Sequence, residues 1–89
     1  MKILAREENW ISARVGDELV MMSIDSDVYI GLTEVGARIW ELIETPQEVD
    51  TVCTRLASEY EVDPATCRRE VDAFVADLVK NGAARLEAR

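Results

Sequence analysis

The sequence contains no histidine, and its four glycines are far apart. Without histidine, the chain lacks the side chain that most often acts as a general base near neutral pH and that most often binds zinc. The glycines, at positions 16, 31, 36 and 82, form no phosphate-binding loop, which needs several glycines close together. We therefore expect a protein that is not an enzyme and that uses neither a metal ion nor an organic cofactor.

Long apolar runs are also missing. The first residues, MKILAREENW, place only Ile3, Leu4 and Ala5 before an arginine and a pair of glutamates, which is too short for a secretory signal. No later run approaches the roughly 20 apolar residues of a membrane-spanning helix. We expect a cytoplasmic protein with no membrane partner.

Basic residues are few relative to acidic ones. The 18 aspartates and glutamates against 10 lysines and arginines give a formal net charge of −8. Such a surface repels the phosphate backbone of DNA and RNA. Nucleic acid is therefore not the expected partner, although the order of the predicted elements leaves a winged-helix DNA-binding regulator as an alternative.

The chain has only two cysteines, Cys53 and Cys67. Each lies on the apolar face of a predicted helix, which is typical of buried and unreactive thiols. A disulfide between them is the alternative, but nothing in the sequence indicates secretion.

Apolar residues make up 48% of the chain and charged residues 31%, which is typical of a folded protein. Its length of 89 residues predicts a single domain over residues 1–89. Apolar runs at residues 10–15, 19–24 and 28–32 are separated by the turn-forming stretches VGDE and DSD. The runs predict a three-stranded antiparallel sheet, with all strands within residues 2–32.

Three helices are predicted after the strands, at about residues 33–44, 46–60 and 64–81. Thr33 and Asp63 are suitable N-caps, Pro46 and Pro64 suit the first helical position, and Gly82 suits the residue after the last helix. Residues 83–89 form either a short edge strand or a loose tail. The resulting class is α+β, winged helix-turn-helix-like.

Two features of this arrangement point to a peptide ligand. The third strand is short and last in the sheet, so that one edge is free to accept an extended peptide. The third helix carries a partly apolar flank beside its core face, at Arg68, Asp72, Val75 and Val79. Ordinary packing is the alternative explanation of both features.

The stretches YIGLTEVGARIWELI and VDTVCTRLASEYEVDPATCRREVDAFVADLVKNGAAR resemble the PqqD-like family, the recognition elements that bind precursors of ribosomally made, modified peptides. The resemblance covers about residues 28–86. It departs from the common pattern at Thr33, where asparagine is frequent, and at Val75, where leucine is. The resemblance implies a winged-helix-like domain that binds a precursor's N-terminal leader as an added strand and delivers it to modifying enzymes.

Carried over position by position, the resemblance implies two sets of peptide-binding residues. The strand edge would be Asp27, Val28, Tyr29, Ile30 and Gly31, and the helix wall would be Arg68, Val71, Asp72, Val75 and Val79.

The sequence leaves two alternatives each for the biosynthetic pathway and for the oligomeric state. A freestanding domain of this length resembles the leader-binding proteins of lasso-peptide biosynthesis, which work with a leader peptidase and a cyclase. The alternative within the family is the carrier of pyrroloquinoline quinone (PQQ) biosynthesis, whose partner is a radical SAM enzyme. We expect a monomer or, because a free strand edge can pair with a second copy, a strand-paired or swapped homodimer.

Overall fold

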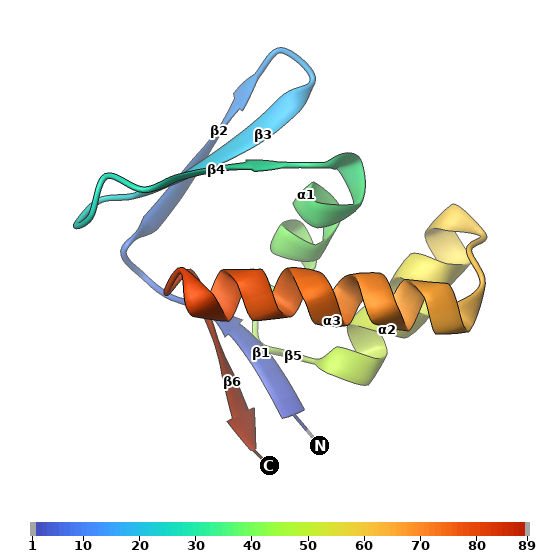
Figure 1. Ribbon diagram of the computed structural model, residues 1–89. Helices are drawn as coiled ribbons and strands as arrows, with labels where there is room; N and C mark the ends of the chain where they lie inside the picture. Colours follow the sequence, from blue (N-terminus) through green and yellow to red (C-terminus); the bar gives the residue numbers. More distant parts are fainter. Residues whose placement is uncertain (1, 89) are drawn as a thin grey trace.

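The computed structural model describes residues 2–88, which form two small antiparallel sheets and three helices. In chain order the elements are β1 (Lys2–Arg6), β2 (Trp10–Val15), β3 (Glu18–Ser23), β4 (Tyr29–Leu32), α1 (Glu34–Leu42), β5 (Gln47–Glu48), α2 (Val49–Tyr60), α3 (Pro64–Lys80) and β6 (Ala84–Ala88). Figure 1 shows α3 crossing the middle of the molecule, with β2–β4 above it and β1 and β6 below it. The predicted α+β, winged helix-turn-helix-like class is confirmed.

The first sheet is the predicted meander, with the strand order β2-β3-β4. Gly16 has a φ of 65° in the turn between β2 and β3. This is the left-handed region, which glycine adopts without steric cost. Asp27, in the turn before β4, has a φ of 56°.

The second sheet, with the order β5-β1-β6, was not predicted. Strand β1 pairs with β6 along its whole length, and Ile3 and Leu4 pair with Glu48 and Gln47 of β5. The prediction that the second helix begins at residue 46 is therefore wrong. Gln47 and Glu48 are extended because their backbone pairs with β1, and α2 begins at Val49.

Local capping explains where α1 begins and where α3 begins and ends. The Thr33 hydroxyl accepts a hydrogen bond from the Gly36 amide at 3.1 Å, and the Asp63 carboxylate accepts one from the Thr66 amide at 3.1 Å. After α3, the Gly82 amide bonds the Val79 carbonyl, the next amide bonds the Leu78 carbonyl, and Gly82 has a φ of 74°. This pattern is a Schellman motif, so the predicted role of Gly82 is confirmed.

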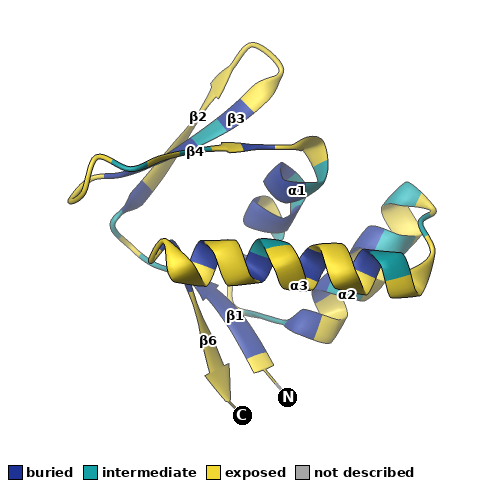
Figure 2. Cartoon of the chain, in the orientation of Figure 1, coloured by how far each residue is buried: buried dark blue, intermediate teal, exposed yellow. Residues whose placement is uncertain are grey.

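One hydrophobic core connects both sheets to the three helices. It includes Leu4 of β1, Met21 of β3, Ile39 of α1, Leu56 of α2 and Leu78 of α3, none of which is more than 1% exposed. Figure 2 shows buried and exposed residues alternating along α3. Among residues 2–88, no helix has the length and apolar character that crossing a bilayer requires.

Candidate functional site

Strand β4 lies at the edge of its sheet. In the part of the chain that the structure describes, β4 pairs with β3 alone. The Ser23 amide donates to the Val28 carbonyl at 2.9 Å, so these residues form a hydrogen-bonded pair of the antiparallel ladder. Because such pairs alternate with non-bonded ones, Ile30 also bonds β3, whereas the amide and carbonyl groups of Tyr29 and Gly31 point to the free edge.

The side chains of β4 alternate between the core and solvent. Ile30 is half-buried and Leu32 is buried, whereas Tyr29 is 67% exposed and Gly31 is exposed. A Cβ atom on Gly31 would have no heavy atom within 4 Å, so the fold itself does not require a glycine there.

The end of β4 leads directly into α1, whose first turn contacts α3. A Cβ atom on Gly36 would be 3.1 Å from Cε1 of Phe74, so the Phe74 ring lies against this turn. A pocket of about 330 Å³ is formed here by Thr33, Val35, Gly36, Ile39, Glu70, Ala73 and Phe74. We call the side of α3 that carries Glu70, Ala73 and Phe74 the Phe74 flank.

The predicted helix wall lies on the other side of α3. Arg68, Asp72, Val75 and Val79, the Val79 flank, line a separate cavity of about 580 Å³ with Lys2 of β1 and Leu86 of β6, and no residue of β4 lines it. This cavity therefore does not extend to the β4 edge. The two flanks lie on opposite sides of the core-facing residues of α3, and the Phe74 flank is the one that shares its pocket with Thr33 and α1, directly after β4. Peptide binding by the Val79 flank stays a prediction.

Two of the predicted wall residues are buried. Val71 is 0% exposed and belongs to the core cluster, so its side chain cannot contact a peptide, and its place in the wall is corrected. Val75 is 5% exposed, although it reaches the cavity of the Val79 flank.

The charged residues of the Val79 flank bind one another. The Arg68 guanidinium contacts the carboxylate of Asp50 on α2, and its Nε lies 3.1 Å from Oδ1 of Asp72. The hydrogen bond to Asp50 is the main cause that raises the pKa of Arg68. A charged ligand group would have to compete with these internal partners.

The predicted strand edge extends slightly beyond β4. Tyr29, Ile30 and Gly31 lie within β4, whereas Asp27 and Val28 precede it. Asp27 is exposed in the turn and Val28 is half-buried against the core. An extended ligand on this edge would therefore hydrogen-bond to the free backbone groups of Tyr29 and Gly31.

The cysteines are free thiols, as their pattern predicted. Cys67 is buried and Cys53 is half-buried, and the Cys67 Sγ lies 3.7 Å from the Cys53 carbonyl oxygen. Burial raises the pKa of both thiols, which disfavours the reactive thiolate. Among residues 2–88, no group of three or more cysteine, aspartate or glutamate side chains is placed to hold a metal ion.

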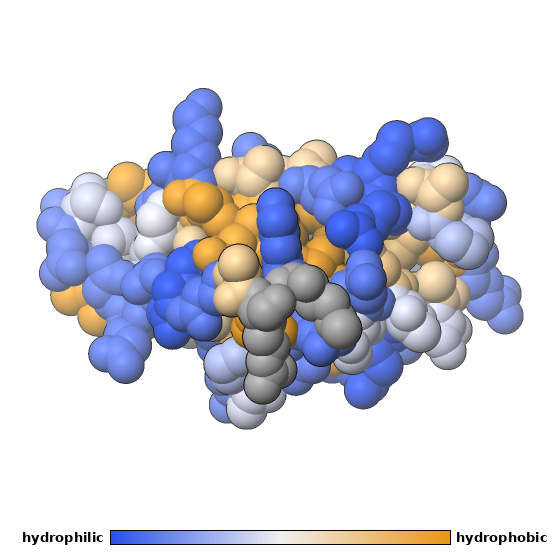
Figure 3. Space-filling model, turned by 90° about the horizontal axis from the view of Figure 1, so that it is seen from below, coloured by the Kyte–Doolittle hydropathy of each residue, from blue (hydrophilic) through white to orange (hydrophobic). Residues whose placement is uncertain are grey.

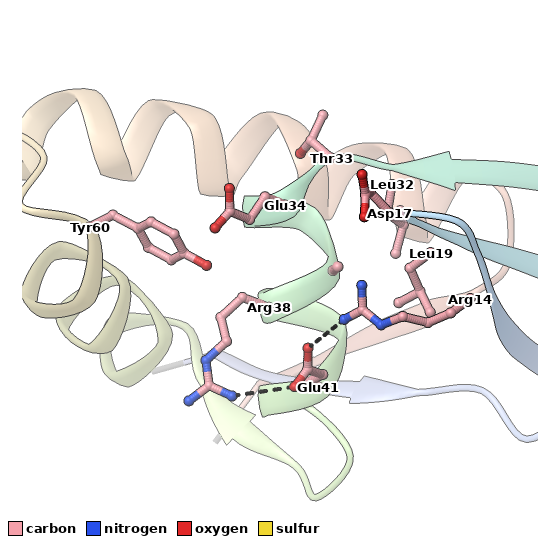
Figure 4. Close-up of a pocket in the computed structure, with 10 residues that line it drawn as sticks. Arg14, Asp17, Leu19, Leu32, Thr33, Glu34, Arg38, Glu41 and Tyr60 are labelled. Atoms are coloured by element: carbon pink, nitrogen blue, oxygen red, sulfur yellow. Dashed lines mark ion pairs between the residues drawn. The ribbon is translucent and has the colours of Figure 1, made fainter.

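A polar pocket of about 420 Å³ lies between the β2–β3 hairpin and the helices α1 and α2 (Figure 4). Glu41 lies 3.6 Å from both Arg14 and Arg38 there, and the Arg38 Nε lies 2.8 Å from Oε1 of Glu59 on α2. These ion pairs link the hairpin and α2 to α1, whereas Asp17 and Glu34, which also line the pocket, form no ion pair with another described residue.

The chain matches one protein family and is similar to solved structures. The family described as "Coenzyme PQQ synthesis protein D (PqqD)" matches residues 18–83, from the start of β3 to just after α3. A solved structure described as "TbiB1 in Complex with the TbiA(beta) Leader Peptide" is similar with a TM-score of 0.82 and 28% identity, over 91% of this chain and 94% of the other. A second, "Lasso peptide synthetase B1 complexed with the leader peptide", gives a TM-score of 0.79 and 26% identity, over 92% and 96%.

No curated protein sequence matches the chain. The family match nevertheless spans well over half of it and includes β4, α1 and α3, the elements that form the candidate site. This chain therefore belongs to the PqqD family.

Proposed function

We propose that this protein binds the leader segment of a ribosomally synthesised precursor peptide and delivers it to modifying enzymes. The observation that carries the proposal is the free edge of β4, where Tyr29 and Gly31 present unpaired backbone groups. The similar TbiB1 and lasso peptide synthetase B1 structures, each described as a complex with a leader peptide, support it.

The leader binds by adding a strand to β4. Its backbone hydrogen-bonds to Tyr29 and Gly31, which provides affinity for an extended segment of almost any sequence. Since successive side chains of a strand point in opposite directions, alternate leader residues face the domain and its pockets provide selectivity.

The wall opposite the strand is the Phe74 flank of α3. The Phe74 ring supplies an apolar surface, and the exposed Ala73 leaves space beside it. Glu70 lies in the same pocket and disfavours an acidic leader residue at this place. In this arrangement the Phe74 flank takes the place of the wall expected at Arg68, Asp72, Val75 and Val79.

The protein itself is not a catalyst in this proposal. The chain has no histidine to act as a base near neutral pH, and burial raises the pKa of both thiols, which disfavours a cysteine nucleophile. Its contribution is tethering, because a leader held on a protein that also binds the enzyme reaches that enzyme at a high effective concentration.

A lasso-peptide pathway with a leader peptidase and a cyclase is the pathway we favour. It is supported by the lasso peptide synthetase B1 structure, which is similar over almost the whole chain. The alternative, a peptide carrier of PQQ biosynthesis that works with a radical SAM enzyme, is suggested by the name of the family. No observation favours the winged-helix DNA-binding regulator, and the net charge of −8 opposes it.

Titration calorimetry with synthetic leaders tests the proposal. The leader encoded beside the protein is expected to bind as a 1:1 complex, and a scrambled leader of the same composition is expected to bind at least about tenfold more weakly, because its side chains do not match the pockets. Tight binding of the PQQ precursor in place of a lasso precursor would select the alternative pathway. If none of the leaders binds, the proposed function is wrong.

A further inference from the structure

The cavity on the Val79 flank is not used by the proposed leader site. It lies between α3 and the sheet of β1 and β6, and apolar side chains from three elements line it: Val49, Val75, Val79 and Leu86. Val79 and Leu86 are 41% and 37% exposed, which is high for two apolar side chains that line the same cavity. Figure 3 looks onto this side and shows hydrophobic atoms gathered among hydrophilic ones.

Both lysines of the sequence lie at this cavity. Lys2 and Lys80 line it from β1 and from the end of α3. Neither makes an ion pair with another described residue, whereas Arg68, in the same cavity, is paired with Asp50 and Asp72. Lys2, Lys80 and Arg68 against Asp50 and Asp72 leave one positive charge uncompensated at this cavity, on a chain whose net charge is −8.

We propose that this cavity docks an acidic segment with apolar anchors, carried by the enzyme that receives the leader. Carboxylates of the segment pair with Lys2 and Lys80, and an apolar side chain inserts between Val79 and Leu86. Opposite charge on the two partners would speed their encounter and select the segment.

This inference rests on the proposed function and adds a named surface to it. A carrier must hold its leader and its enzyme at the same time, so the two surfaces cannot overlap. The leader site uses β4 and the Phe74 flank, whereas the cavity is on the opposite flank of the same helix. A second copy of this chain is a poorer occupant, because two chains of net charge −8 repel each other.

The test uses the leader peptidase of the pathway as the probe and measures its binding to full-length variants by interferometry. One variant, Lys2→Glu with Lys80→Glu, reverses the charge, and its control, Lys2→Arg with Lys80→Arg, keeps it. A second variant, Val79→Gln, removes the apolar contact. Its control is Val15→Gln, since Val15 is 64% exposed on the β2–β3 hairpin, away from the cavity. Calorimetry with the leader is carried out on every variant.

Charge reversal and Val79→Gln are each expected to weaken enzyme binding at least about tenfold, with leader affinity and both controls unchanged. Raising the ionic strength from about 0.05 to about 0.3 M is expected to weaken enzyme binding as well. Unchanged enzyme affinity, or no enzyme binding by the unmodified chain, would overturn the inference. So would a parallel loss of leader affinity, which would assign the cavity to the leader, or dimerisation through the cavity detected by sedimentation. The leader titration of the unmodified chain separately tests the proposed function.

Discussion

The Phe74 ring of α3 lies against Gly36 of α1, so that a Cβ atom on Gly36 would be 3.1 Å from Phe74 Cε1. Gly36 is in the first turn of α1, immediately after β4 and its connecting Thr33. This contact therefore fixes the end of β4 relative to one flank of α3. In the proposed function, these two elements form the two sides of the leader groove.

Replacing Gly36 with valine is expected to lower the free energy of unfolding by about 1–3 kcal/mol, because its branched side chain overlaps the Phe74 ring. In a Phe74→Ala background the same replacement should cost clearly less, since the ring is absent. Denaturant unfolding of the four proteins of this cycle measures the coupling. Equal costs in both backgrounds would show that the ring does not restrict position 36.

Truncating a buried valine of α3 should destabilise the protein more than truncating an exposed one. Val71→Ala is expected to lower the free energy of unfolding by about 2 kcal/mol, because Val71 is 0% exposed and truncation leaves a cavity. Val79→Ala, on a side chain that is 41% exposed, should change it by less than about 0.5 kcal/mol. A comparable loss in both variants, measured by thermal unfolding, would contradict the assignment of Val71 to the core.

The ion pair of Arg38 and Glu59 should make stability depend on pH. Two hydrogen bonds join these side chains, at 2.8 and 2.9 Å, and they lower the pKa of Glu59. Because the pKa is lower in the folded than in the unfolded state, the pair stabilises the fold above the unfolded value of about 4.3. This stabilisation is lost as the pH falls through the lower, folded pKa.

Glu59→Gln is accordingly expected to lower the Tm at pH 7 and to have the same Tm as the unmodified protein in strong acid. Glu8→Gln is the control, since Glu8 is exposed and forms no ion pair with a described residue. If the difference in Tm caused by Glu59→Gln persists unchanged in acid, charge pairing is not its cause.

Replacing one exposed alanine on each flank of α3 tests which of the two flanks binds the leader. Ala73 and Ala76 are both exposed on α3, Ala73 on the Phe74 flank and Ala76 in the cavity of the Val79 flank. Ala73→Trp is expected to weaken leader binding at least about tenfold, or about 1.4 kcal/mol, because the indole fills the groove. Ala76→Trp should leave leader binding unchanged. The reverse result, by calorimetry, would restore the predicted wall.

Much of the fold could be predicted because its signals are local. Alternating apolar runs, the caps Thr33 and Asp63, and Gly82 located the meander and the ends of the helices within a few residues. The second sheet could not be predicted in the same way. It joins β1 to β6 and to the two residues of β5, and pairing between segments so far apart leaves no short-range pattern.

The site could be predicted only in part for a related reason. The edge strand followed from its place at the end of the meander, but the flank of α3 that faces it depends on how the helix is rotated in the fold. Both flanks border the same core-facing residues, and the partly apolar Val75 and Val79 favoured the Val79 flank, whereas the proposed function uses the Phe74 flank. The contact of Phe74 with Gly36, which places the other flank of α3 beside the end of β4, is visible only in three dimensions.

The central claim, that a leader adds as a strand to the free edge of β4, is tested most directly at Gly31. Gly31→Pro removes the outward-pointing amide without removing a bond to β3, whereas Gly31→Ala keeps the amide and adds a Cβ atom that meets no heavy atom within 4 Å. Calorimetry with the leader should show at least about tenfold weaker binding for Gly31→Pro, because a leader carbonyl loses its partner, and a change within about twofold for Gly31→Ala. Equal leader affinity of the two variants, with both folded, would contradict strand addition at this edge.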